Sequence, residues 1–325
     1  MVREEAAAVY DKVLFVDVLR GSDSAPGDSW DTPLQSINGA MAKLYGGDDS
    51  STNSPGDARA RAAFAVIYRS YLTGGNAPAT QQIINVSGVH LIGAGIWEGG
   101  AGSQFESTFV VDGSKLTAQT GILTGLESLY AGLVIAADAC VVDGIYFYHN
   151  NGTNNPYSLA VADYETHSGS SGHANSGRGC GVFNSVFQGD VNGALSIYGL
   201  GLNGAEASLV AGNHFRYSKE GITIGGGPNR YANSNRLSDN LFSACERAVK
   251  GFNASVAENT IERALITDKS TYGYSLVAGL DFTTGGGYHA IDCRVGHVTK
   301  TTAYVAGTGN LFTNCMYNQN VIFPT

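Results

Sequence analysis

The sequence is poor in charge, in proline and in cysteine. Charged residues make up 14% of its 325 positions, and it holds 7 prolines, 5 cysteines and 2 tryptophans. The low charged fraction argues against coiled coils and long solvated helices. No Lys/Arg-rich stretch occurs and no apolar run approaches the ~18 residues of a membrane span, so neither nucleic acid nor a membrane is an expected partner.

The chain has a formal net charge of -9, and its first residues are acidic where a secretion signal would be basic and then apolar. Its cysteines form no CxxC pair and lie far apart, at Cys140, Cys180, Cys245, Cys293 and Cys315. We therefore expect reduced, buried thiols in a protein without a signal peptide that is made in a cytoplasm. The sequence has no nucleophile elbow, HExxH motif, Walker loop or dinucleotide-binding loop, so no cofactor and no metal is expected.

Glycine is abundant, at 44 positions, and accompanies a degenerate internal repeat. Three stretches that begin at Asn184, Gly212 and Asp239 align without gaps. Each places a phenylalanine six residues before a small residue, in the pairs Phe187 with Gly193, Phe215 with Gly221, and Phe242 with Ala248. Alternating apolar residues follow, such as Leu195 and Ile197 in the first stretch and Ile222 and Ile224 in the second.

Repeats built from short alternating strands and glycine- or asparagine-rich corners are typical of a solenoid of parallel strands. The three phenylalanines are 28 and 27 residues apart. We expect stacked coils in which like positions lie ~4.8 Å apart along the axis. The predicted inward stack is Phe187, Phe215, Phe242 and Ile261, and the predicted corner ladder is Asn213, Asn240, Asn259 and Asn310.

Two kinds of segment depart from the repeat. Residues 32–45 and 57–72 have apolar residues at helical spacing and are followed by glycine pairs, which predicts two helices that cap the N-terminal end of the solenoid. A polar excursion at about 148–178 separates two coils. The predicted organisation is an attachment segment at 1–15, an opening strand with capping helices at 16–80, and a parallel β-helix at 81–325.

The opening segment carries a motif. It resembles the strand–loop–helix that opens many right-handed parallel β-helix proteins, through Val16-Asp17, Gly21-Ser22-Asp23, Gly27, Ser29-Trp30, Thr32-Pro33 and Ser36-Ile37. The coils resemble those of the pectate-lyase-like superfamily, which includes polysaccharide lyases, glycoside hydrolases and bacteriophage tailspikes. The resemblance implies an all-β fold, a right-handed single-stranded parallel β-helix with short N-terminal capping helices. It indicates a fold and not a reaction.

Enzymes of this superfamily are expected to gather their acids on one outer face of the solenoid. In the polar excursion, Asp163, Glu165 and His167 would share one side of an extended chain and could serve acid–base or metal chemistry. The alternative is a polar loop that keeps its charges in water.

The coil alignment supplies a second acidic pair. It places Asp190 and Glu220 on adjacent coils, within reach of one glycosidic bond. It also places Glu220 beside Arg247, which is the arrangement of a solvated charge ladder. Both interpretations stay open.

Glycine triplets carry candidate glycan contacts. Arg230 and Tyr231 follow one triplet, and Tyr288 and His289 follow another. Aromatic and arginine side chains on glycine hinges suit a sugar ring or a neighbouring subunit. Ordinary turns are the alternative.

The sequence leaves three candidate functions open. The first is a structural or binding protein of a phage particle, a decoration or spike protein located in the virion. It would form a homotrimer, contact other virion proteins through its N-terminal segment and contact host-surface polysaccharide. The second is a tailspike-like polysaccharide depolymerase, a hydrolase or a lyase. The third is a bacterial β-helix protein with another role.

Overall fold

The computed structural model describes most of the solenoid. Its described residues are 10–44, 63–70, 81–95, 107–112, 131–151, 157–162, 177–191, 197–225, 232–251, 258–267, 276–283, 286–296, 303–306, 309–317 and 321–322. The predicted site residues Asp163, Glu165, His167, Arg230 and Tyr231 lie outside these ranges.

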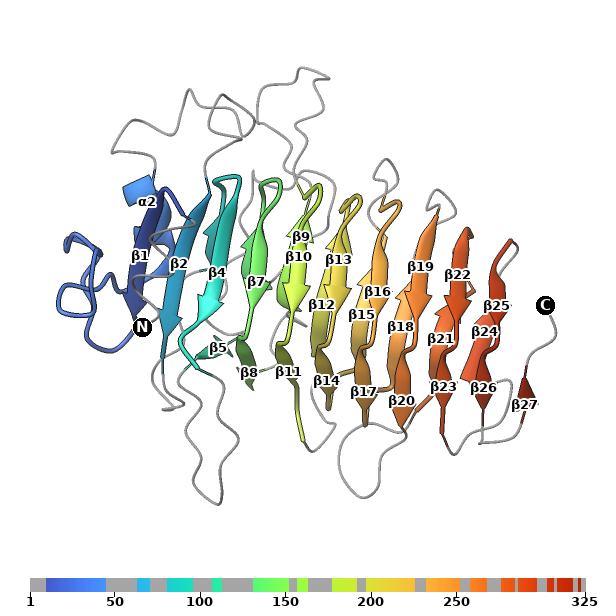
Figure 1. The fold of residues 1–325 in the computed structure, drawn as a ribbon. Coiled ribbons are helices and arrows are strands. Elements are labelled where there is room, and N and C mark those ends of the chain that lie inside the picture. Colours follow the sequence, from blue (N-terminus) through green and yellow to red (C-terminus); the bar gives the residue numbers. More distant parts are fainter. Residues whose placement is uncertain are drawn as a thin grey trace, which may run out of the picture.

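Three long parallel sheets run the length of the molecule (Figure 1). The ten-stranded sheet consists of β1 (Lys12–Asp17), β2 (Phe64–Arg69), β4 (Val89–Gly93), β7 (Val141–Asp143), β10 (Gly181–Phe183), β13 (Leu209–Ala211), β16 (Arg236–Ser238), β19 (Asn259–Glu262), β22 (Tyr288–Ile291) and β25 (Leu311–Thr313). The nine-stranded sheet consists of β5 (Thr108–Asp112), β8 (Tyr146–Asn151), β11 (Val186–Gln188), β14 (His214–Arg216), β17 (Leu241–Ser243), β20 (Leu265–Thr267), β23 (Arg294–Val295), β26 (Met316–Tyr317) and β27 (Val321–Ile322). The eight-stranded sheet consists of β3 (Gln82–Ile84), β6 (Ala131–Ile135), β9 (Tyr157–Ala162), β12 (Tyr198–Asn203), β15 (Glu220–Ile224), β18 (Arg247–Gly251), β21 (Ala278–Phe282) and β24 (Tyr304–Ala306).

From β4 to β24, each coil takes the chain from the ten-stranded sheet to the nine-stranded sheet and then to the eight-stranded sheet. Consecutive coils pair in parallel, and β27 alone among the described strands pairs antiparallel, with β26. The coils wind in the right-handed sense, as nearly all parallel crossovers do. The predicted right-handed parallel β-helix is therefore confirmed.

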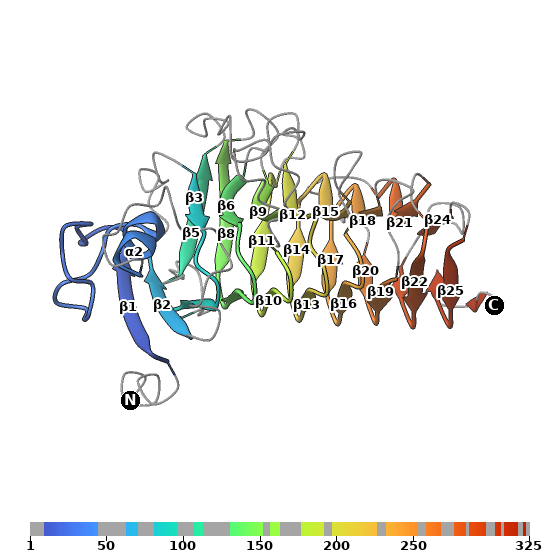
Figure 2. The ribbon, with the colours of Figure 1, turned by 90° about the horizontal axis from the view of Figure 1, so that it is seen from above.

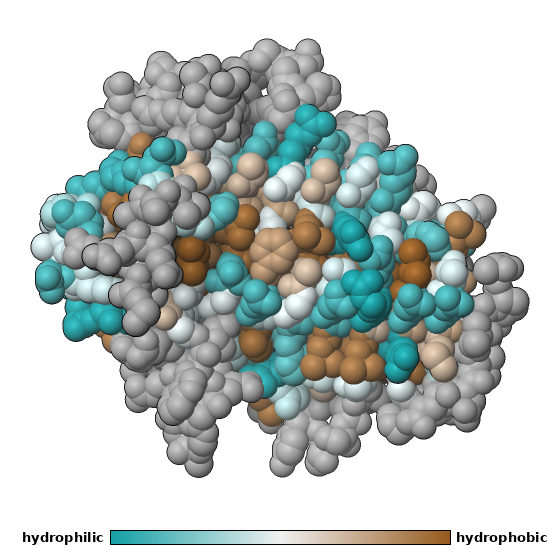
Figure 3. All heavy atoms as spheres, in the orientation of Figure 1, coloured by the Kyte–Doolittle hydropathy of each residue, from teal (hydrophilic) through white to brown (hydrophobic). Residues whose placement is uncertain are grey.

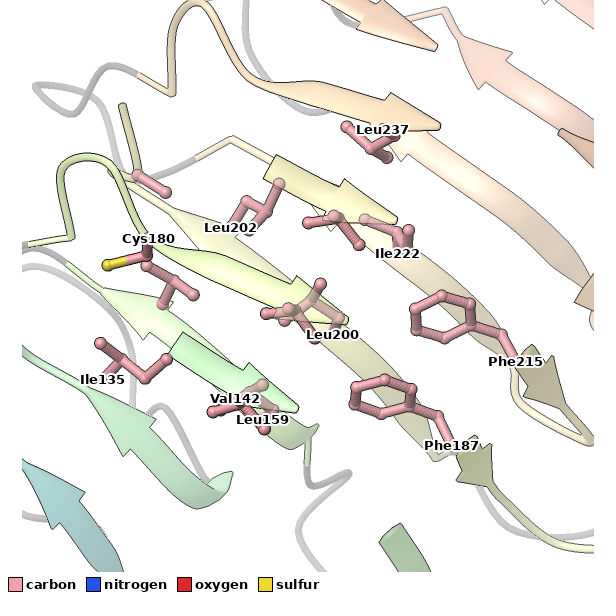
Figure 4. Close-up of a cluster of buried hydrophobic side chains, with 14 of the residues drawn as sticks. Ile135, Val142, Leu159, Cys180, Phe187, Leu200, Leu202, Phe215, Ile222 and Leu237 are labelled. Atoms are coloured by element: carbon pink, nitrogen blue, oxygen red, sulfur yellow. The ribbon is translucent and has the colours of Figure 1, made fainter. Parts of the chain in front are cut away.

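The interior is a stack of like side chains. The ring centroids of Phe147, Phe187, Phe215 and Phe242 follow one another at 4.8, 4.5 and 5.1 Å with near-parallel planes. Phe187 and Phe215 lie one above the other and point toward the side chains of the eight-stranded sheet (Figure 4). The predicted phenylalanine stack is correct, but Ile266 and not Ile261 continues it, since Phe242 pairs with Ile266.

Ile261 instead lies in the ten-stranded sheet, where it pairs with Leu237 and Ala290. The gapless alignment also failed within one coil. The residues that pair with Ile222 and Ile224 are Leu200 and Leu202, which lie six residues beyond the positions that the ungapped alignment gives. The corner after β11 is longer than in the next coil, so Gly199 takes the place assigned to Gly193.

The asparagines form two corner ladders rather than one. At the corner between the ten- and nine-stranded sheets, the Asn213 side-chain amide donates to the Asn240 side-chain carbonyl, 3.1 Å away. At the corner between the eight- and ten-stranded sheets, Asn235 donates in the same way to Asn259 at 3.0 Å. Asn310 continues the second ladder, since its side-chain carbonyl accepts the Tyr288 amide N–H.

The N-terminal end is covered by α2 (Ile37–Leu44), as predicted for this segment (Figure 2). The Asp23 carboxylate accepts the backbone N–H groups of Gln35 and Ser36, and the Ser36 hydroxyl accepts the Gly39 N–H as a helix N-cap. These bonds explain why the opening motif needs an aspartate and a serine. The buried residues of α2 are Ile37, Gly39, Ala40, Met41 and Leu44.

Three predicted boundaries need correction. The second predicted helix is wrong over Phe64–Arg69, which is strand β2. It is apolar on both faces because its outward Ala65 and Ile67 are buried in a cluster with Phe15 of β1, against which Trp30 packs. The attachment segment at 1–15 overlaps the solenoid, since β1 begins at Lys12. Within the predicted excursion at 148–178, Tyr157–Ala162 is strand β9. No helix among the described residues has the length and apolar character of a membrane span.

Candidate functional site

The candidate site lies on the outer face of the eight-stranded sheet. The inward row in register across β9, β12, β15, β18 and β21 consists of Leu159, Leu200, Ile222, Val249 and Leu280. The pleat places the residue after each of them on the outer face. One outer row therefore carries Ala160, Gly201, Thr223, Lys250 and Asp281, and a second row at the strand starts carries Tyr157, Tyr198, Glu220 and Arg247.

Glu220 is the most unusual side chain of this face. Its residue surface is only 3% exposed. Oε1 accepts a hydrogen bond from Lys250 Nζ at 2.9 Å and lies 3.9 Å from Arg247 Nη1. Oε2 is buried and has no hydrogen-bond partner among the described residues. Burial raises the pKa of the Glu220 carboxyl, and the hydrogen bond and charge of Lys250 oppose that rise.

Arg247 links the acids of neighbouring strands. Its guanidinium lies 2.6 Å from Glu246 Oε1 and 3.1 Å from Asp281 Oδ2, in addition to the more distant Glu220. The predicted pairing of Glu220 with Arg247 across adjacent coils is confirmed by their register. The charges thus alternate along the sheet, which avoids like-charge stacking.

Two tyrosines stand beside the charged row. The ring centroids of Tyr157 and Tyr198 are 5.0 Å apart, and the Tyr157 hydroxyl accepts a hydrogen bond from Thr223 Oγ1 at 3.2 Å. Burial first, and then the negative charge of Glu220, raises the pKa of Tyr198, so its hydroxyl is neutral at ordinary pH. Rings with polar tips beside a carboxylate suit the apolar faces and hydroxyls of a sugar.

The other predicted acid, Asp190, is half-buried in the corner that follows β11. The pairing of β11 with β14 places it next to Ser218, as the alignment predicted. Its pairing with Glu220 as a catalytic dyad stays a prediction.

One predicted glycan contact is wrong. Tyr288 is 1% exposed, stacks on Phe282 with ring centroids 4.3 Å apart, and donates its hydroxyl to the Ile224 carbonyl. The ring therefore belongs to the core and is closed to a glycan. His289 is half-exposed on the outer face of the ten-stranded sheet, where Nε2 lies 2.9 Å from Thr313 Oγ1. It is on a different side of the solenoid from Glu220.

An apparent nucleophile and base pair is structural. His149 Nε2 lies 2.6 Å from the Ser158 hydroxyl. Both side chains are buried, and burial lowers the pKa of His149 to about 3. A serine enclosed in this way cannot reach a substrate carbonyl. Among the described residues, no group of three His, Cys, Asp or Glu side chains is placed to hold a metal ion.

The sequence interpretation missed Tyr157, Tyr198 and Lys250. Lys250 could have been found, because it follows Ala248 as Thr223 follows Gly221 in the ungapped repeat. The tyrosines could not, because the polar excursion and the long corner after β11 hide the strands that carry them.

The comparisons with known proteins show no family for this chain. No family model and no curated protein matches the sequence. Among solved structures, a rhamnogalacturonan lyase is similar with 12% identity and a TM-score of 0.46, over 88% of this chain and 68% of that one. Pectate lyase Pel9A is similar with 15% identity and a TM-score of 0.36, over 95% of this chain and 76% of that one. ORF18 of Geobacillus virus E2 is similar with 12% identity and a TM-score of 0.34, over 94% of this chain and 60% of that one. The chain is a parallel β-helix by its own three sheets and their strand register.

Proposed function

We propose that the protein is a structural or binding component of a phage particle, a decoration or spike protein that presents a rigid rod to surface glycans. The rod is a homotrimer of β-helices, and residues 1–9, ahead of β1, contact the other virion proteins. The solenoid supports this role because its core stack and corner ladders bind each coil to the next.

Charge compensation on the outer faces is the observation that carries the proposal. Glu220 is paired with Lys250, and Glu246 and Asp281 are both paired with Arg247. On the ten-stranded sheet, Glu262 is paired with Arg236 and Arg263 in the same way. A carboxylate held by a cation stays ionised and hydrogen-bonded, which suits cohesion and ligand contact better than proton transfer.

The test is co-purification with particles. Purified particles should carry the protein in fixed stoichiometry after a salt wash, and a chain lacking residues 1–9 should no longer attach while folding as before by circular dichroism. The full chain should sediment as a trimer. Absence of the protein from washed particles would overturn the proposal.

Glycan cleavage is a second candidate, favoured by Glu220 alone. A carboxyl group with a raised pKa and one oxygen without a partner among the described residues has the features of a general acid. In a reducing-sugar assay on host polysaccharide, Glu220→Gln and Asp190→Ala should each abolish turnover. Asp281→Asn is the matched control, since Asp281 is an ion-paired acid of the same face. No turnover by the unmodified protein on any host polysaccharide would eliminate this candidate.

A further inference from the structure

The outer face of the nine-stranded sheet differs in charge from the rest of the molecule. The core residues Phe147, Phe187, Phe215, Phe242, Ile266 and Val295 point inward, so the residues beside them point outward. From β8 to β26 the outward row at the strand starts is Tyr146, Val186, His214, Leu241, Leu265, Arg294 and Met316, and the next row is Tyr148, Gln188, Arg216, Ser243 and Thr267. These described rows contain no acid, in a chain with a net charge of -9.

The two arginines of this face have no ion-pair partner among the described residues. Every other described arginine is ion-paired; these are Arg20, Arg69, Arg178, Arg236, Arg247 and Arg263. Arg216 and Arg294 therefore keep their full charge for a partner outside the described chain. An arginine fork without a counter-charge matches a carboxylate or a phosphate.

Arg216 is already oriented by its neighbours. Its guanidinium lies 5.7 Å from the Tyr146 ring centroid, and one Nη lies 3.5 Å from the Tyr146 hydroxyl. That hydroxyl in turn donates to Gln188 Oε1 at 2.7 Å. The Arg216 Nε is buried and has no acceptor among the described residues. Tyr148 stacks on Tyr146 and is half-exposed, so it offers a ring beside the cation.

Arg294 lies at the rim of a hollow further along the same face. A groove of about 600 Å³ is lined by Leu265, Arg294 and Met316 together with the corner residues Arg263, Ala264, Asp292 and Asn314. Leu265 is 46% exposed there. Figure 3 shows an apolar patch in the lower part of this side of the molecule, with hydrophilic side chains beside it. The groove combines an apolar floor with two arginines and one acid, Asp292, and Arg263 is already paired with Asp239. Apolar floors with a few polar groups are typical of sugar sites.

The two arginines are spaced for a polymer. Arg216 is in β14 and Arg294 is in β23, three strands further along the sheet. Three strand spacings correspond to about 14 Å along the axis. A single oxyanion could satisfy one arginine only, whereas a chain with repeated oxyanions that lies parallel to the axis could satisfy both.

We propose that the outer face of the nine-stranded sheet binds an anionic glycan, an extended chain of sugars or polyols bearing carboxylates or phosphodiesters, with Arg216 and Arg294 as its anchors. Tyr148 stacks against a ring of that chain, and Gln188 and Ser243 contact its hydroxyls. This inference rests on the proposed function, because it names the chemistry of the glycan that the particle protein contacts.

The experiment measures binding of three oligomers of equal length to the full chain by calorimetry: a polyuronate, a polyol phosphodiester and a neutral glucan. At least one anionic oligomer should bind, about tenfold or more tightly than the glucan, and the affinity should fall with salt. Arg216→Gln and Arg294→Gln should each weaken that binding about tenfold. Arg236→Gln is the matched control, because Arg236 is exposed and paired with Glu262 on another face, and it should leave binding unchanged.

Equal binding by the glucan, or equal losses in all three variants, would overturn the inference. The inference would also be overturned if Arg216→Gln dissociated the oligomer in sedimentation without changing glycan affinity. The face would then be a subunit interface. Particle attachment is measured on the same variants. If the Arg216→Gln and Arg294→Gln variants attach to particles and keep their glycan affinity, only this inference is refuted. If the unmodified protein is missing from washed particles, the proposed function is refuted.

Discussion

At the corners of this solenoid, asparagine amides and cysteine thiols both donate hydrogen bonds to backbone carbonyls of the preceding coil. The Asn213 and Asn240 amides donate to the carbonyls of Val182 and Val210 in the preceding coil. Two coils further on, the Cys293 thiol occupies the equivalent place and donates to Ile261 O at 3.5 Å. A thiol is a weaker donor than an amide and offers no strong acceptor to the next coil. This explains why all five cysteines are free and buried, as predicted.

Replacing Asn240 tests the ladder. Its side chain accepts both the backbone and side-chain N–H groups of Asn213 and donates to Val210 O. Asn240→Ala should lower the free energy of unfolding by about 3 kcal/mol, because buried groups lose their partners. Asn240→Cys keeps one donor and should lose less. Urea unfolding measures both, and equal losses in the two variants would contradict the ladder.

The buried His149 predicts a specific acid sensitivity. Burial lowers its pKa to about 3 in the folded protein, while a free histidine titrates near 6.5. Between these values the unfolded chain binds a proton that the folded chain does not, so stability falls as the pH falls. The loss should reach about 3 kcal/mol at pH 4.

His149→Gln should remove that part of the pH dependence. Its overall stability can differ from that of the unmodified protein, so the measured quantity is the slope of unfolding free energy between pH 7 and pH 4. Equal slopes for the two proteins would show that His149 takes up its proton as readily in the folded protein as in the unfolded chain.

At the scale of the strand, periodicity identified the solenoid but not every element. The Asn-x-Phe pattern marked β14 and β17 because their corners have equal length. It failed at β12, where a longer corner shifts the pairing by six residues, so that Gly199 and not Gly193 lies opposite Gly221. Phe64–Arg69 was predicted to be helical because a strand that is apolar on both faces has no alternation to detect.

The same limit applies to the candidate site. The pairing of Glu220 with Arg247 was predictable, since both lie in coils without insertions. The contact of Lys250 with Glu220 follows from that register. The burial of Tyr288 was not predictable, because its glycine neighbours suggested an exposed turn while its ring stacks on Phe282.

The eight-stranded sheet depends on a row of small residues against the phenylalanine stack. A Cβ added at Gly221 would lie 2.7 Å from the Ala248 carbonyl oxygen and 2.7 Å from a Phe242 ring carbon. Gly221→Ala should therefore destabilise the fold by about 2 kcal/mol through overpacking. At Gly296 the added Cβ would meet only Ile266 O at 3.8 Å. Gly296→Ala should change the stability by less than about 0.5 kcal/mol, and thermal unfolding compares the two.

The whole molecule is a one-dimensional stack. The ten strands of the largest sheet define nine spacings, or about 43 Å along the axis. The strands of each coil pair only with those of the neighbouring coils, so stability is approximately a sum of coil and interface contributions. The N-terminal coil is covered by α2, whereas the described C-terminal strands end in the antiparallel pair β26–β27. Opening should therefore begin more readily at the C-terminal end.

The buried thiols report that opening without any substitution. Cys140 and Cys180 lie toward the N-terminal end, Cys245 lies in the middle, and Cys293 and Cys315 lie in the last coils. Burial raises the pKa of Cys245 to about 12, so a thiol reagent reacts with it only after the coil opens. Pulse labelling with mass spectrometry should modify Cys315 first and Cys293 next, before Cys245, Cys180 and Cys140. Rates are divided by those of the unfolded chain to remove intrinsic reactivity. Identical protection at all five positions would mean that the stack opens as one cooperative unit, and the nearest-neighbour description would then be wrong.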